Sequence, residues 1–154
     1  MRAKIDKTLE VALTIIMGAM VLNVLLQVFA GFFRIQIDFT EEVAGFLLIW
    51  VGLLGASYAT GKKLHLAIDL LPRSRSPQAQ KKFNIIINII VLLFALGVMV
   101  IGGIRLVYIS LSLNQVSPLL EFPKGYIYTV LPLSGLIIIY YSIANMKEDN
   151  PFGN

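Results

Sequence analysis

The chain has 154 residues, of which 57% are hydrophobic and only 14% charged, and its mean hydropathy is +0.80. Soluble domains carry about 25% charged residues, so this composition excludes an ordinary soluble domain. The chain has no cysteine, which excludes both a disulfide framework and a thiolate metal site. Its net charge is +4 and its pI is near 9.4.

Four stretches without a charged residue fill most of the chain, at residues 11–33, 43–61, 83–104 and 125–146. About 20 apolar residues cross a hydrocarbon layer of roughly 30 Å as a helix. We therefore predict an all-α integral membrane protein with four transmembrane helices in a single domain over residues 1–154. The first stretch is longer than the apolar region of a signal peptide, about 7 to 15 residues, so we expect a retained helix.

The 13 basic residues are distributed unequally between the linkers. Three lie after the first or third stretch, namely Arg34, Arg105 and Lys124, and the other ten lie at the opposite ends of the stretches. The positive-inside rule therefore predicts that both termini and the 62–82 loop are cytoplasmic. We expect the basic residues of that loop to face anionic lipids and not nucleic acid. They are Lys62, Lys63, Arg73, Arg75, Lys81 and Lys82.

The 62–82 loop also contains an apolar run at residues 64–71, which is too short to span a membrane. This run predicts a short interfacial helix or an extension of the second helix. Ser76 followed by Pro77 is a typical helix start, so the third helix should begin there. His65 is the single histidine, with Asp69 one turn away, and this pair predicts a solvated loop and not a metal site.

The first stretch contains two amides, Asn23 and Gln27, spaced four residues apart and therefore on one helix face. Unpaired amides are unfavourable in hydrocarbon, so this face should turn toward other helices. We expect this face to pack against another helix, of this chain or of a partner. We favour this role over lining a substrate path.

Small residues form a stripe about 60° wide along the second stretch. The stripe consists of Gly45, Gly52, Ala56 and Ala59, with Gly55 at its edge. Such stripes let a neighbouring backbone approach closely. Two interpretations remain open, packing within the chain and docking of a partner subunit, and Trp50 in mid-span is a candidate for the second.

Charged residues at the outer ends are candidates for periplasmic docking. Glu41 and Glu42 lie where the second helix should begin, where acidic side chains complement the helix dipole, and a salt bridge to a partner is the alternative. Arg105 follows the third stretch and should reach outward to the headgroups. Arg34 completes this set of docking candidates.

The predicted spans contain no ionisable residue, whereas ion-coupled transport usually places one near mid-membrane. This argues against a self-contained antiporter, an intramembrane protease and a haem-binding bundle, and we expect no enzyme activity and no cofactor. Two other functions of small helical membrane proteins are alternatives here. A homo-oligomeric small channel or exporter would have only Asn23 and Gln27 as pore-lining candidates, and an anchor of a respiratory complex would need histidines within the spans.

Several segments in order resemble the small membrane (Q, DctQ-type) subunit of tripartite ATP-independent periplasmic (TRAP) transporters. They are Phe39-Thr40-Glu41-Glu42, Trp50, the 52–59 segment, Lys63-Leu64-His65-Leu66-Ala67-Ile68-Asp69, Pro118 through Pro123 to Tyr126, and Leu131-Pro132-Leu133-Ser134-Gly135. The resemblance covers nearly the whole chain. Family members often carry Arg soon after the first-helix Gln, whereas this chain has Gly31 there and Arg34 three residues later.

The resemblance implies an accessory role in the bacterial inner membrane. Such a subunit packs beside a large membrane subunit that binds substrate and sodium ions. A periplasmic binding protein delivers an organic acid, such as a C4-dicarboxylate, a keto acid or a sialic acid. The sodium ions would therefore lie on the partner and not on this chain.

Overall fold

The computed structural model describes residues 2–35, 37–62 and 77–148, with side chains at 82–147 in the last range. These ranges form helices joined by turns, with one isolated β-bridge between Val116 and Pro123. The elements are α1 (Arg2–Phe32), α2 (Phe39–Gly61), α4 (Pro77–Phe94), the π-helix η1 (Ala95–Gly102), α5 (Gly103–Ser112), α6 (Lys124–Tyr128) and α7 (Val130–Glu148). Four helical segments are long and apolar enough to cross a membrane, which confirms the predicted fold class.

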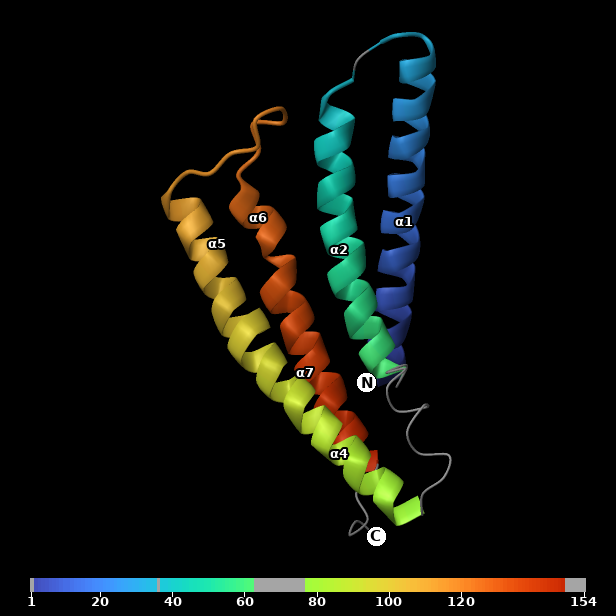
Figure 1. Cartoon of the computed structure of the whole chain (residues 1–154), viewed down its shortest axis with the longest axis vertical. Coiled ribbons are helices and arrows are strands. Elements are labelled where there is room, and N and C mark those ends of the chain that lie inside the picture. The colour runs from blue at the N-terminus through green and yellow to red at the C-terminus, as the bar shows by residue number, and fades with distance from the viewer. Residues whose placement is uncertain (1, 36, 63–76, 149–154) are drawn as a thin grey trace.

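The helices are arranged as two hairpins, α1 with α2 and the α4–η1–α5 rod with α6 and α7 (Figure 1). The two hairpins meet where α2 lies against α7. There the Ser57 hydroxyl donates to the Ser134 carbonyl at 3.2 Å, and the Asn145 amide donates to the Thr60 carbonyl at 3.0 Å. α7 is therefore the central helix of the fold.

The third helical rod extends beyond the uncharged stretch at residues 83–104 at both ends. Its helix begins at Pro77, as the Ser-Pro pair indicated, but it continues beyond residue 104 to Ser112. The reason is that no helix-breaking residue follows Ile104 until Asn114, whose φ of 47° ends the helix. Arg105 consequently lies inside the continuous helix Lys82–Ser112, which is long and apolar enough to cross a membrane, just after the uncharged stretch that ends at Ile104.

α1 and α5 end in the same way, with one residue in the left-handed conformation. At the end of α1, Arg34 has φ 57°, and the next amide, of Ile35, donates to the Ala30 carbonyl at 2.9 Å. At the end of α5, Asn114 takes this position, and the Gln115 amide donates to the Ser110 carbonyl at 3.0 Å. These bonds satisfy carbonyls that the helix itself leaves unpaired.

The second hairpin is held by close backbone approach at glycines. A Cβ added at Gly135 of α7 would lie 2.8 Å from the Met99 Cβ and 3.3 Å from the Ala95 carbonyl in η1. Likewise, a Cβ at Gly103 would lie 2.9 Å from the Pro132 Cδ. Helices in lipid usually associate through close contact between small residues, because the burial of apolar surface does not favour their association there.

Candidate functional site

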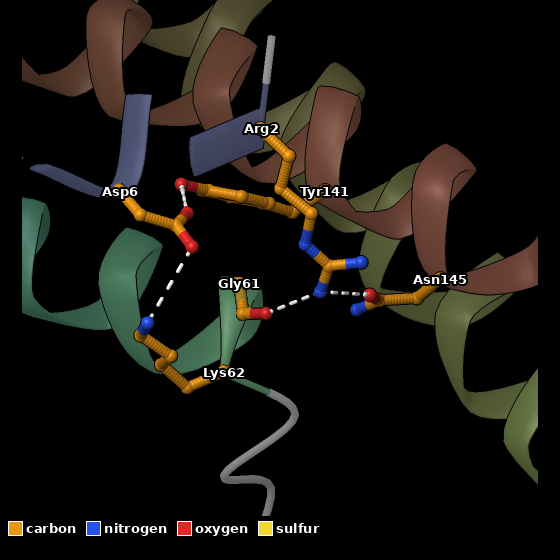
Figure 2. Close-up of polar contacts among 6 residues, drawn as sticks. All are labelled: Arg2, Asp6, Gly61, Lys62, Tyr141 and Asn145. Atoms are coloured by element: carbon orange, nitrogen blue, oxygen red, sulfur yellow. Dashed lines mark hydrogen bonds and ion pairs between the residues drawn. The ribbon is translucent and has the colours of Figure 1, made fainter. Parts of the chain in front are cut away.

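A cluster of polar side chains joins three helices at the end of the molecule where the N-terminus lies (Figure 2). Arg2, at the start of α1, donates from Nη2 to the Gly61 carbonyl at 2.5 Å and to the Asn145 Oδ1 at 3.0 Å. Its guanidinium carbon also lies 5.9 Å from the centre of the Tyr141 ring. One arginine thus links α1 to the ends of both α2 and α7.

Asp6, one helical turn beyond Arg2, completes this cluster. The buried Tyr141 hydroxyl donates to Asp6 Oδ1, while the Lys62 ammonium lies 3.5 Å from Asp6 Oδ2. The Asp6 side chain is 19% exposed and that of Lys62 is 42% exposed, so the hydrogen bond is better shielded from solvent than the ion pair. We call Arg2, Asp6, Gly61, Lys62, Tyr141 and Asn145 the polar cluster.

A second polar bridge connects the two hairpins near the ends that lie away from the N-terminus. The Glu42 carboxylate, in the first turn of α2, accepts a hydrogen bond from the Ser117 hydroxyl. The same oxygen accepts from the backbone amides of Leu119 and Leu120, at 3.3 and 3.2 Å. Glu42 therefore orders the 115–123 turn of its own chain. Asp38, at the N-cap of α2, makes no side-chain capping bond.

The small-residue stripe of α2 divides into two parts. Gly45, Gly52 and Ala56 are exposed, whereas Gly55 and Ala59 are partly buried. A Cβ added at Gly45, Gly52 or Gly55 would meet no described neighbouring atom within 4 Å. The chain therefore does not use these glycines for packing against its own helices.

The other helix-facing candidates mostly pack within the chain. Trp50 is partly buried and lies against the core formed by Leu9, Leu54, Val130 and Tyr141. The Asn23 amide donates to the Thr40 carbonyl of α2 at 2.8 Å, so it links α1 to α2. Gln27 is exposed, although it was expected to share a helix-facing side with Asn23.

Among the residues that the structure describes, no three His, Cys, Asp or Glu residues gather in a group that could hold a metal ion. A family model described as tripartite ATP-independent periplasmic transporters, DctQ component, matches residues 9–150. The chain belongs to this family. It is also 27% identical, over 135 residues, to a Haemophilus influenzae protein named as a TRAP transporter small permease, with 87% of this chain and 82% of the relative covered. The family is a transporter component, and this member is a multi-pass membrane protein.

The outer charged residues of this DctQ-family chain lie in different settings. Arg34 is exposed in the turn between α1 and α2, and Glu41 is exposed in the first turn of α2. Arg105 is exposed on α5, seven residues before the helix ends. Of the four docking candidates, Glu42 is the one whose side chain has hydrogen-bond partners among the described residues.

The basic loop is described only at its two ends. Lys62 belongs to the polar cluster and Lys82 is exposed on α4. Lys63, Arg73 and Arg75, the interfacial helix expected over residues 64–71 and the His65–Asp69 pair lie outside the described residues, as does the side chain of Lys81.

Five of the six residues of the polar cluster, all except Lys62, were not among the candidates from the sequence. A usable signal was present, because Arg2 and Asp6 are four residues apart, as are Tyr141 and Asn145. Residues spaced by four share one helix face. One pair lies at the start of α1 and the other near the end of α7, and in antiparallel helices these two ends are neighbours. The two pairs could therefore have indicated a contact between α1 and α7.

Proposed function

We propose that this chain is the accessory membrane subunit of a sodium-driven importer of organic acids in the bacterial inner membrane. In this proposal it pairs with a large membrane subunit that binds the sodium ions and the substrate. A periplasmic binding protein delivers that substrate. The family match supports membership of such a transporter, and the features below support the accessory role.

The observation that carries the proposal is the exposed part of the α2 stripe, Gly45, Gly52 and Ala56. A glycine offers an acyl chain no side chain to pack against, whereas it allows the backbone of another helix to approach closely. Since no described helix of this chain does so, a helix of another subunit is the partner that this surface fits. The exposed Gln27 on α1 supports the same conclusion, because an amide within a span favours a protein neighbour over hydrocarbon.

The distribution of charge also fits a supporting role. The two polar bridges lie near opposite ends of the helices, and each is used to hold hairpins together. Arg105 is the exception, since it is exposed within a candidate span. We propose that it contacts outer headgroups or a carboxylate of the large subunit, and that Arg34 and Glu41 contact the periplasmic partner.

The test is substitution in the stripe, with co-purification of the large subunit and substrate uptake as readouts. Gly52→Leu and Ala56→Leu place bulk where the partner helix would approach, and overpacking of this kind costs about 1 to 3 kcal/mol. We expect lower recovery of the complex while the isolated chain keeps its helicity and thermal stability. Gly18→Leu is the matched control, because Gly18 is equally open but lies on α1. Normal assembly of both stripe variants would refute the proposal.

A homo-oligomeric channel is the alternative, and the structure weakens it. Asn23, one of its two pore-lining candidates, is bonded to Thr40 within the chain, which leaves Gln27. Purification of the chain alone separates the two functions. A stable homo-oligomer that forms without the large subunit would favour the channel, and a monomer that becomes stable only with that subunit would favour the accessory role.

Orientation is part of the proposal, with both termini in the cytoplasm. Single cysteines at Lys4 and Leu119, both exposed, should react with an impermeant reagent from opposite sides of sealed cells. Ser117 is unsuitable because its side chain is buried against Glu42. Labelling of both positions from one side would contradict four crossings with this topology.

A further inference from the structure

A cavity of about 510 Å³ opens beside the polar cluster, between the first turns of α1 and the end of α2. Its charged lining consists of Asp6, Lys7 and Glu10 from α1 and Lys62 from α2. Figure 2 shows the inner part of this lining, where Lys62 is directed toward Asp6. Lys7 and Glu10 form the outer part and are exposed. Neither is paired with another described residue, whereas Asp6 is fixed by Tyr141.

The cavity lies where the charged start of α1 meets its uncharged stretch. Its charged residues precede the uncharged stretch of α1, which begins at Val11. The rest of the lining continues into that stretch, with Val11 and Ile15 as apolar walls. One end of the cavity is therefore polar and the other apolar, in the order that a phospholipid presents along the membrane normal.

The balance of charge selects among lipids. Two carboxylates, of Asp6 and Glu10, face two ammonium groups, of Lys7 and Lys62, so the charged lining is neutral as a whole. An anionic headgroup gains most from a surplus of basic residues, as in a polybasic segment. A headgroup with both a phosphate and a primary ammonium matches a lining that offers both signs, because each of its charges finds an opposite one.

We propose that this cavity binds the headgroup of an aminophospholipid of the phosphatidylethanolamine type, from the leaflet around the N-terminal end of α1. The phosphate lies between the Lys7 and Lys62 ammonium groups, and the primary amine donates to the Glu10 carboxylate. One acyl chain follows Val11 and Ile15. The inference stands on the lining of this chain alone and does not depend on the transport role or the large subunit.

The test is lipid titration of the purified, delipidated full-length chain, with bound lipid counted by native mass spectrometry. The probes are phosphatidylethanolamine, phosphatidylcholine and phosphatidylglycerol with identical acyl chains. We expect phosphatidylethanolamine to bind most tightly, because the choline ammonium has no N–H donor and the glycerol headgroup has no positive charge. Glu10→Gln should weaken phosphatidylethanolamine binding about two- to fivefold, the range for exposed ion pairs. It should not weaken phosphatidylglycerol binding, because loss of the carboxylate leaves a surplus of basic residues in the lining.

Two further variants keep the result interpretable. Lys7→Gln should weaken all three lipids, because each carries a phosphate, while Lys4→Gln, an exposed lysine of α1 outside the cavity, should change none. Helicity by circular dichroism confirms that each variant is folded. Equal binding of the three lipids by the parent chain would overturn the proposal, as would a preference for phosphatidylglycerol or an unchanged affinity in Glu10→Gln.

Discussion

Gly61→Ala tests how tightly the polar cluster holds α2 against α7. A Cβ at Gly61 would lie 2.7, 2.8 and 2.9 Å from three carbons of the Tyr141 ring, closer than such contacts tolerate. The ring has no free space to retreat into, because Tyr141 is 0% exposed and its hydroxyl is bonded to Asp6. Overpacking typically costs about 1 to 3 kcal/mol, so we expect a loss of about 2 kcal/mol in the free energy of unfolding.

The assay is unfolding of the purified chain in mixed micelles, followed by helicity, for a double-mutant cycle. If the ring contact causes the loss, Gly61→Ala should cost much less in a Tyr141→Ala background, because the clashing atoms are gone. Gly52→Ala is the matched control on the same helix. Its Cβ meets no described neighbour, so it should be neutral or stabilising by up to about 1 kcal/mol. Equal losses from Gly61→Ala in both backgrounds would refute the explanation.

Three other changes test the remaining contacts. Tyr141→Phe should lower the free energy of unfolding by about 1 kcal/mol in the same assay. Lys62→Gln should lower it by less, because the hydroxyl bond to Asp6 is shielded from solvent and the lysine ion pair is not. A larger loss in Lys62→Gln than in Tyr141→Phe would contradict this. Glu42→Ala should speed hydrogen exchange about 5- to 10-fold at the two turn amides that it accepts, with unchanged exchange elsewhere as the control. Arg34→Gly should stabilise the chain by about 1 kcal/mol, since φ is 57° there, and a loss would show that the side chain makes a contact of its own.

The fold class could be predicted from the sequence because few backbone structures are stable within a lipid bilayer. A chain in hydrocarbon must satisfy its backbone internally, so four long uncharged stretches predict four helices without knowledge of their packing. The end of the third helix could not be read in this way. Arg105 marks the end of an apolar run, but helix geometry depends on backbone conformation, and the left-handed Asn114 is what stops it.

The contacts between helices were harder to predict than the helices themselves. The helical spacing of small residues predicted the stripe of α2. That spacing does not show which residues of the stripe the chain's own helices bury and which remain exposed. That division depends on where α7 crosses α2, which Ser57 and Thr60 fix through bonds to α7. Trp50, which was considered for a partner because of its mid-span place, packs on the chain's own core for the same reason.

The same geometry explains why one helix of this small fold stays open to a neighbour. α7 is covered on several sides, whereas α1 fully buries only Leu9 and Ala30 along its length from Arg2 to Phe32. α1 nevertheless keeps its position, because Arg2 and Asp6 tie one end to α2 and α7, and Asn23 ties the middle to α2. A helix fixed by polar contacts does not need a buried apolar face. Its apolar surface is therefore free to face lipid or the large subunit that we propose as the partner, without loss of the hairpin that presents it.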